Sequence, residues 1–296
     1  VYKSRRSNNT KRMYENIIEK HFTALNALKL KDVDRIHIET LLANAEDKRR
    51  TQQQILLTFS AVLKSAVSDK LLAANVADDI LRNTDKIKYK PSEKRPLTPA
   101  EKKAVFDATY KYDSDQAYVY LIYGCGLRRE ECVALTIFDF SFKKREVSVS
   151  KAYEYITNTP GVKDPKSSNG IRTIPIPSKI LPVIQSYVES VKHSGRTQLF
   201  VTMRDKKPLT KSAYDKMWKR IVESMQAACK EDIVGLTGHV FRHNYCSSLC
   251  YQIPRVSIKR IAQLLGDTEA MVMNVYSHIL AEREDVEGAV NDAINF

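Results

Sequence analysis

The first 90 residues contain neither glycine nor proline, and this absence restricts the fold of the chain more than any other feature of its sequence. Both residues interrupt regular helices, so helices in this stretch are ended only by polar turns. Apolar residues recur at helical spacing over 14–22, 33–41 (Ile36 among them) and 55–66, and "NVADDILRN" at 75–83 indicates a short fourth helix. Four helices of these lengths predict a small bundle.

A charged segment with three prolines, "KIKYKPSEKRPLTPAEKKAVF" at 86–106, follows the predicted bundle. It has no apolar periodicity until Val105, which is typical of a linker. A new helix is then expected, with Thr98 as its N-cap and Pro99 at its first position. The chain is long enough for two cores, and we expect two domains, 1–95 and 96–296.

The second domain is predicted to mix helices and strands. "EVSVSKAYEY" at 146–155 alternates apolar and polar side chains as a strand does, and "IRTIPIP" at 171–177 is a second extended segment whose prolines suit a sheet edge. Long helices are expected at about 178–192 and 209–228, and two more follow. The predicted class is mainly α with a small antiparallel β-sheet: a helical bundle followed by an α+β domain.

The net charge of +13 and the pI of about 9.4 point to a polyanionic partner. Nucleic acid is favoured over a membrane, because no basic amphipathic anchor is present and the longest apolar run, 117–127, is about half of the ~20 residues that a spanning helix needs. Residues 1–96 hold 20 basic and 12 acidic side chains, so we expect this part to grip DNA, although a solvated helix face explains any single lysine. The candidate DNA contacts are Arg5, Lys11, Lys86, Lys88 and Lys90.

The five cysteines are typical of a reduced, cytoplasmic protein. The polar, basic start has no apolar segment of the kind found in secretory signals, and it begins with Val1 rather than methionine, as a fragment would. His239, His243, Cys246 and Cys250 fall at helical spacing but would span ~16 Å, so at most a neighbouring pair could bind one zinc ion. Buried cysteines on a core helix are the favoured interpretation, and no metal site is predicted.

Two segments carry single basic residues at places where a chain turns. "GCGLRREECVAL" at 124–135 places Arg128 at the start of a helix after a glycine turn, where pairing with Glu130 or Glu131 is the simpler interpretation. "KSSNGIRTIP" places Lys166 at the mouth of a hairpin whose turn signal is Asn169-Gly170. A loop lysine there is usually only solvated.

Two later segments suggest a phosphate site and a reactive hydroxyl. In "TGHVFRHNYCSSL" Thr237 can cap a helix that carries His239 and Arg242 three residues apart on one face. The N-terminus of a helix with a histidine and an arginine favours an anion. "LLGDTEAMVMNVYSHIL" at 264–280 contains Tyr276 in an apolar helical pattern, where a buried aromatic is the simpler interpretation.

Taken in order, "GLRREE", a hairpin lysine before "RTIP", "HVFRH", "LLG" and a tyrosine eleven residues after Leu265 resemble the tyrosine recombinases of the phage and conjugative-transposon integrase branch. The resemblance covers nearly the whole chain. It implies that 1–95 is a core-binding domain and 96–296 a catalytic domain. It also implies strand cleavage through a 3′-phosphotyrosyl bond that conserves the energy of the phosphodiester.

By this resemblance Tyr276 is the nucleophile, and Arg128 and Arg242 bind the phosphate oxygens with planar, forked guanidinium groups. Lys166 matches the general acid that protonates the leaving 5′-oxygen. Lys163 competes for that role, because the turn length leaves three residues of ambiguity.

His239 matches the residue that assists proton transfer to or from the tyrosine and binds the phosphate. Glu131 is expected to orient Arg128 or His239. Because the arginines stabilise the charge that a metal stabilises elsewhere, the resemblance implies neither a metal nor a cofactor.

Asp267 departs from the family pattern, which usually has histidine or tryptophan directly after "LLG". A histidine or tryptophan donates a hydrogen bond to the phosphate, whereas an ionised carboxylate only accepts and is repelled. We expect Asp267 either to oppose the phosphate, to turn toward a nearby cation, or to be held neutral by burial.

The resemblance therefore implies an integrase of a mobile element that acts as a homotetramer on paired double-stranded DNA sites, with accessory DNA-bending proteins among its expected partners. The last segment, "AEREDVEGAVNDAINF" at 281–296, fits equally a helix donated to a neighbouring copy and one packed on its own domain. Two alternatives remain open: a non-catalytic or weakly active DNA-binding relative, for which Asp267 is the reason, and a type IB-like topoisomerase that acts as a monomer.

Overall fold

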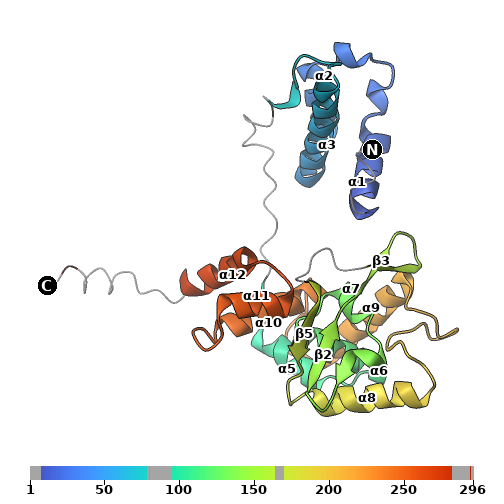
Figure 1. Ribbon diagram of the computed structural model, residues 1–296, viewed down its shortest axis with the longest axis vertical. Coiled ribbons are helices and arrows are strands. Elements are labelled where there is room, and N and C mark those ends of the chain that lie inside the picture. Colours follow the sequence, from blue (N-terminus) through green and yellow to red (C-terminus); the bar gives the residue numbers. More distant parts are fainter. Residues whose placement is uncertain (1–7, 79, 81–94, 164–169, 282–293, 295–296) are drawn as a thin grey trace. The chain divides into compact units, whose positions relative to one another are not determined.

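The protein, shown as a computed structural model in Figure 1, is described here for residues 8–78, 80, 95–163, 170–281 and 294. The chain forms two compact units, Val1–Glu93 and Lys94–Phe296. Among the residues described, no helix combines the length and the apolar character needed to cross a membrane.

The first unit is a set of helices joined by short turns. Its main helices are α1 (Asn8–His21), α2 (Arg35–Ala43) and α3 (Arg49–Ser68), with single turns of 3₁₀-helix at Thr23–Leu25 and Leu30–Asp32. The helix expected at 75–83 lies partly outside the described residues, although Ala77 and Ile80 are buried in the core of the unit.

The core of the first unit forms where α1 and α2 pack on α3. Phe59 of α3 lies 5.1 Å from Phe22, ring centre to ring centre, in an edge-to-face contact that adds roughly 0.5–1.5 kcal/mol to the burial of the two rings. Ile36, expected on an apolar face, is 69% exposed. The buried face of α2 instead carries Ile38, Leu41 and Leu42, which fall at i, i+3 and i+4, whereas Ile36 lies out of that phase.

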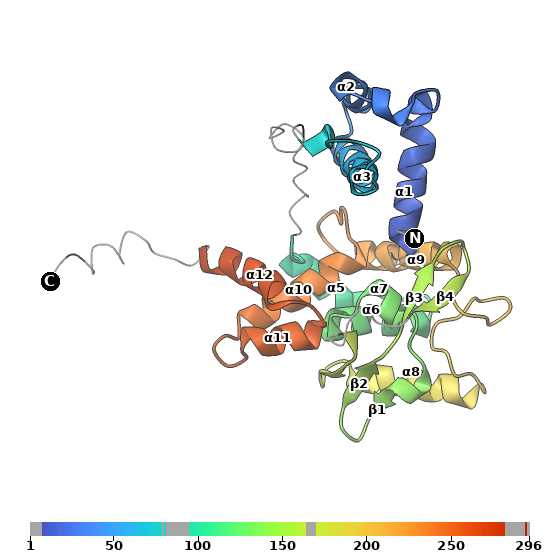
Figure 2. The same ribbon diagram turned by 45° about the horizontal axis from the view of Figure 1, so that its top comes forward.

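The second unit contains eight α-helices and five strands among its described residues, arranged as in Figures 1 and 2. Thr98 caps the first of them by accepting a hydrogen bond from the backbone of Glu101 at 3.1 Å, and Pro99 stands at its first position, which confirms the predicted start. The helices are α5 (Pro99–Asp107), α6 (Asp113–Cys125), α7 (Arg129–Cys132), α8 (Leu181–His193), α9 (Lys211–Ala228), α10 (Gly238–Cys250), α11 (Ile258–Leu265) and α12 (Glu269–Ala281).

The strands form two small antiparallel sheets. One has the order β1 (Phe140–Ser141), β2 (Glu146–Val149), β5 (Arg172–Pro175), and the other pairs β3 (Ala152–Tyr155) with β4 (Pro160–Lys163). The mainly helical class with antiparallel sheet is confirmed.

The prediction of a single strand over 146–155 was wrong. The segment forms two strands, because the chain leaves one sheet after Val149 and enters the other at Ala152. Val147, Val149 and Tyr153 are all buried, so the alternation of burial continues across the break. The pattern therefore hides the change of pairing partner.

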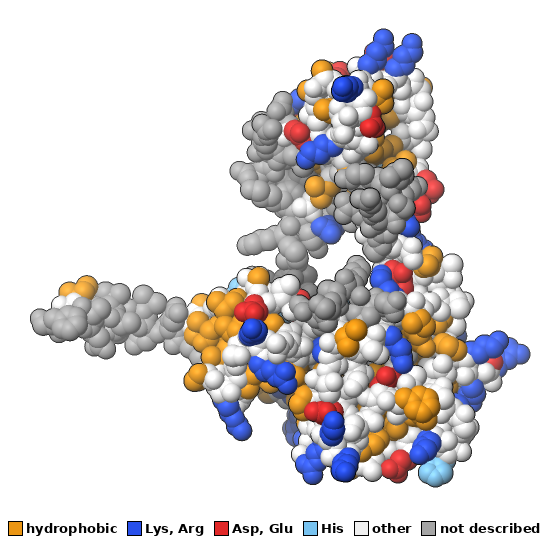
Figure 3. Space-filling view, viewed as in Figure 1, with side chains coloured by type: hydrophobic (Ala, Val, Ile, Leu, Met, Phe, Trp, Pro, Cys, Tyr) orange, Lys and Arg blue, Asp and Glu red, His pale blue; other side chains and the backbone are white. Residues whose placement is uncertain are grey.

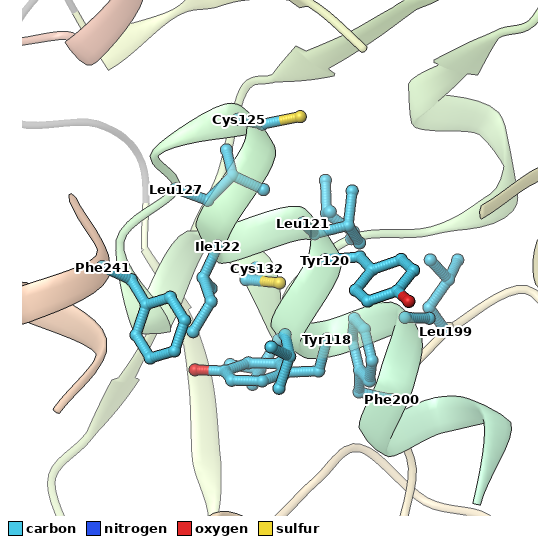
Figure 4. Packing of buried hydrophobic residues seen from close by; sticks show 14 of the residues in the cluster. Tyr118, Tyr120, Leu121, Ile122, Cys125, Leu127, Cys132, Leu199, Phe200 and Phe241 are labelled. Atoms are coloured by element: carbon cyan, nitrogen blue, oxygen red, sulfur yellow. The ribbon is translucent and has the colours of Figure 1, made fainter. Parts of the chain in front are cut away.

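The core of the second unit is built around α6, from which Tyr118, Leu121, Ile122 and Cys125 are fully buried (Figure 4). Helices α7, α8, α9 and α10 all contact α6. The Tyr118 hydroxyl donates a hydrogen bond to that of Tyr214 at 3.1 Å, which satisfies a polar group inside this core. A second, smaller core lies among α10, α11 and α12.

Gly126 ends α6 in the left-handed region, with φ of +60°, and a Cβ at this position would lie 2.3 Å from the ring of Tyr245. Gly126→Ala should therefore lose at least about 2 kcal/mol more free energy of unfolding than Gly195→Ala, because overpacking adds roughly 1–3 kcal/mol to the backbone strain. Gly195 is the matched control: its φ is +72° and nothing lies within 4 Å of the added Cβ. Urea unfolding followed by the fluorescence of Trp218, the only tryptophan, measures both. Equal losses of stability in the two variants would mean that the ring of Tyr245 moves aside without lowering the free energy of unfolding.

Candidate active site

A pocket of about 210 Å³ lies where α10, α11 and α12 meet the start of α7. Three of the four segments singled out in the sequence supply its polar side chains, and the helix that carries Tyr276 supplies part of its apolar wall. The lining residues are Arg128, His239, Arg242, His243, Cys246, Leu265, Asp267, Met271, Val272 and Val275.

Arg128 occupies the N-cap position of α7 and is held from two sides. Its Nη1 donates to Glu131 Oε1 at 2.9 Å, and its backbone N–H donates to Glu131 Oε2 at 2.9 Å. Its Nη2 donates to the carbonyl of Gly266 and to Asp267 Oδ2, each at 3.0 Å. The simple pairing with Glu131 thus exists, but it leaves the guanidinium directed into the pocket, where the side chain is 34% exposed.

Arg242 lies deeper, on α10, with a side chain that is 9% exposed. Its Nη1 donates to the carbonyl of Gly126 at 2.9 Å, and its Nη2 donates to the carbonyl of Leu265 at 2.6 Å and to Asp267 Oδ2 at 3.0 Å. Burial, and then the positive charge of Arg128, lower the pKa of Arg242 to about 10. The group stays charged at neutral pH, so two cations face the same carboxylate oxygen.

The acid that holds Arg128, Glu131, also forms a buried ion pair with Arg172. Arg172, the first residue of β5, donates from Nη2 to Glu131 Oε2 at 2.7 Å and from Nη1 to Glu131 Oε1 at 3.0 Å. Burial by itself would raise the pKa of Glu131, but the hydrogen bonds from Arg172 and the Arg128 backbone bring it down to about 2. Glu131 therefore contacts Arg128 and Arg172 at the same time, and not only Arg128.

Arg172 is a site residue that the sequence reasoning quoted in "RTIP" but did not assign. A signal was present: Arg172 has the same strand phase as Ile174 and Ile176, which are both buried. An arginine on the inward face of a strand needs an acid inside the protein.

The C-terminus of α11 supplies three acceptors for the three arginines. The helix ends in a Schellman motif: the Asp267 N–H donates to the Ala262 carbonyl at 3.0 Å, and Gly266, with φ of +62°, donates to Gln263 at 3.1 Å. The next three carbonyls along the chain accept hydrogen bonds from arginine side chains. Arg172 donates to the carbonyl of Leu264 at 2.8 Å, Arg242 donates to that of Leu265, and Arg128 donates to that of Gly266.

Asp267 bridges the two pocket arginines, so the second of its expected behaviours, turning toward a cation, describes the structure. Burial would raise its pKa, but hydrogen bonds from the Thr268 backbone and from Arg242 lower it overall. Asp267 is therefore an ionised acceptor in the centre of the site.

The other predicted residues of the helices α10 and α12 are His239, Thr237 and Tyr276. His239 is exposed in the first turn of α10 and lines the pocket. Thr237 stands at the N-cap of α10, but its side chain makes no capping hydrogen bond there, so that part of the prediction was wrong. Tyr276 is half-buried on α12 and packs against the core of α10, α11 and α12.

The two candidate lysines differ. Lys163 ends β4 and donates to Glu154 Oε1 at 2.8 Å, whereas Lys166 lies outside the described residues. Of the candidate DNA contacts, Lys11 lies on α1 and is half-exposed; Arg5, Lys86, Lys88 and Lys90 are outside the described residues, as is most of 281–296. Figure 3 shows Lys and Arg side chains at separate places on the visible face of both units.

The cysteines and histidines of α10 form no metal centre in the part of the chain that the structure describes. All five cysteines are free thiols, and Cys246 and Cys250 are buried.

Comparison with known proteins gives a family match over most of the second unit. The sequence profile of the phage integrase family matches residues 95–283. A tyrosine recombinase from Pseudothermotoga lettingae is 26% identical over 266 residues, which cover 89% of this chain and 84% of that protein.

Solved structures agree in fold. The Tn1549 transposon integrase in complex with transposon right end DNA has a TM-score of 0.79 at 22% identity, over 100% of this chain and 96% of that one. A lambda integrase tetramer bound to a Holliday junction has a TM-score of 0.64 at 16% identity, over 91% and 72% of the two chains.

Replacing Glu131 with Gln should remove a pH-dependent part of the stability. The folded pKa of about 2 lies below the ordinary value of 4.5, so the ionised form stabilises the fold fully above pH 4.5 and this contribution is lost as pH falls toward 2. The shift corresponds to ~3 kcal/mol. Urea unfolding at several pH values should show a difference between wild type and variant that shrinks in acid. The exposed Glu223→Gln is the control, and a pH-independent difference for Glu131→Gln would contradict the assignment.

Proposed function

The chain belongs to the phage integrase family and is a tyrosine recombinase, and we propose that it cuts and rejoins DNA strands for a mobile element through Tyr276. The observation that carries the site assignment is the convergence of Arg128 and Arg242 on one carboxylate oxygen, at 3.0 Å each. Two forked guanidinium groups that share one acceptor form a site for an oxyanion such as a phosphodiester.

In the proposed cleavage step, the Tyr276 oxygen attacks the scissile phosphorus. A phosphotyrosyl bond forms, the bond from phosphorus to the 5′-oxygen breaks, and Arg128 and Arg242 stabilise the charge on the non-bridging oxygens. His239, which is exposed and lines the pocket, receives the tyrosine proton. The step is a transesterification, so attack by a 5′-hydroxyl reverses it without an energy source.

Protonation of the 5′-oxygen is assigned to Lys166. The reason is the engagement of Lys163, whose ammonium group is held by Glu154 at 2.8 Å in the β3–β4 hairpin. A lysine kept in such a pair must break it before it can reach a leaving group.

The partners proposed for the chain are paired double-stranded DNA sites and three further copies of itself, with accessory DNA-bending proteins where the sites require them. The fold shared with the lambda integrase tetramer on a Holliday junction supports the tetramer. Free thiols, including those on α10, support work in a reducing compartment, which we take to be the cytoplasm. A monomeric protein that relaxes DNA would instead identify a topoisomerase, and a protein that binds DNA without forming an adduct would identify a non-catalytic relative.

Tyr276→Phe should abolish the covalent protein–DNA adduct and leave DNA binding within a few-fold of wild type, because only the nucleophilic oxygen is lost. The adduct is measured by denaturing electrophoresis after reaction with a nicked suicide substrate. Tyr251→Phe, a change of the same kind at an exposed tyrosine that follows α10, is the control and should keep the adduct. A denaturant-stable adduct from Tyr276→Phe would identify another nucleophile.

DNA binding should weaken steeply with salt, because residues 1–96 carry a net charge of +8 from 20 basic and 12 acidic side chains. The logarithm of the binding constant is expected to fall by about 0.9 per logarithmic unit of salt for each phosphate contacted. Lys11→Gln should reduce that slope by about 0.9, whereas Lys207→Gln, at a lysine that faces Asp205, should not. A flat salt dependence in a fluorescence anisotropy titration would contradict the assignment of the basic unit to DNA.

A further inference from the structure

Asp267 occupies the position between the two pocket arginines that the proposed function gives to the DNA phosphate. Its Oδ2 accepts from Nη2 of Arg128 and from Nη2 of Arg242, each at 3.0 Å. Each of these nitrogens carries two hydrogens, and the second is taken by the carbonyl of Gly266 or of Leu265. Both Nη2 groups are therefore fully engaged, and a phosphate oxygen can bind them only when Asp267 Oδ2 has left.

The charges of the cluster lead to the same conclusion. Arg128, Arg172 and Arg242 contribute three positive charges, and Glu131 and Asp267 contribute two negative ones. The net charge is +1, and without Asp267 it would be +2. An arriving phosphodiester thus meets a site whose attraction for anions is halved by an internal anion.

We propose that Asp267 is an internal substitute for phosphate, which holds Arg128 and Arg242 in place and must be displaced by the scissile phosphate. The inference rests on the proposed function, since it takes the arginines as the phosphate site. Asp267 then sets how tightly that site binds an oxyanion, and its removal strengthens the binding.

The local structure lets the carboxylate move without disturbing the helix that precedes it. The backbone of Asp267 is fixed by its hydrogen bond to Ala262 at the end of α11. The side chain makes its other hydrogen bond, at 3.1 Å, through Oδ1 to the backbone N–H of its neighbour Thr268. Rotation of the side chain therefore releases Oδ2 while the carbonyls of Leu265 and Gly266 stay in place for the arginines.

Inorganic sulfate is a direct probe of the site. Asp267→Asn keeps the size of the side chain but removes its charge, so sulfate should stabilise this variant against heat with a half-saturating concentration at least about tenfold below that of wild type. Without sulfate the variant should melt at a lower temperature, because two cations then face each other across an uncharged group. Glu223→Gln removes an equal charge from the exposed face of α9 and should respond to sulfate as wild type does.

Two further variants keep the test decisive. Asp267→Glu retains the charge and should bind sulfate no better than wild type, and adding Arg128→Gln to Asp267→Asn should cancel the gain. If Asp267→Asn does not fold, Asp267→Ser takes its place with the same expected gain. Equal sulfate responses of wild type and the neutral variants would overturn the proposal.

Single-turnover cleavage of a suicide DNA substrate separates this proposal from the assignment of the nucleophile. Asp267→Asn should reach its maximal rate at a lower DNA concentration, and Asp267→His, whose imidazole N–H can donate to a phosphate, should cleave at least about tenfold faster than wild type. If no variant forms an adduct but the sulfate results hold, the assignment of Tyr276 fails while the role of Asp267 stands. If adducts form but Asp267→Asn requires as much DNA as wild type, the displacement of Asp267 is wrong.

Discussion

The last two carbonyl groups of α11 and the carbonyl of its C-cap, Gly266, each accept a hydrogen bond from a different arginine, and the geometry of the whole site depends on this arrangement. The end of a helix carries unpaired carbonyls and a partial negative charge, so it is a natural place to hold cations. Arg172, Arg242 and Arg128 come from a strand, a helix and a loop that are distant in sequence. One helix end therefore sets the spacing of all three.

The same arginines also form a row of ion pairs in which basic and acidic side chains alternate: Arg172, Glu131, Arg128, Asp267 and Arg242. Each carboxylate lies between two guanidinium groups, which keeps the buried acid Glu131 ionised. Arg172 and Glu131 are closed to solvent, with side chains 5% and 7% exposed, while Arg128, Asp267 and Arg242 line the pocket. This gradient is what a phosphate site needs, because its donors must be fixed before the substrate arrives.

Much of the architecture could be predicted from the sequence, because caps, prolines and helical spacing are local signals; Thr98 with Pro99 is an example. The convergence of Arg128 and Arg242 was implied only by resemblance, since no local pattern tells which distant loops meet. The division of 146–155 between two sheets escaped prediction because alternation records which side chains are buried and not which strand lies alongside. The place of Arg172 depends on Glu131, 41 residues away, and the bridging position of Asp267 depends on Arg242 and Arg128, 25 and 139 residues away. No local pattern in the sequence records such tertiary contacts.

The Schellman motif at the end of α11 also determines which substitutions near the site leave its hydrogen bonds intact. The acceptors at 264, 265 and 266 are backbone carbonyls, so the side chains of Leu264 and Leu265 do not contribute to these hydrogen bonds; both are buried, and Leu265 also lines the pocket. Gly266 is different, because its left-handed φ of +62° directs the chain to Asp267. One or two hydrogen-bond partners of each arginine are thus backbone carbonyls, which a comparison of side chains does not reveal. The apolar residues of this helix can therefore change while the guanidinium groups keep these acceptors.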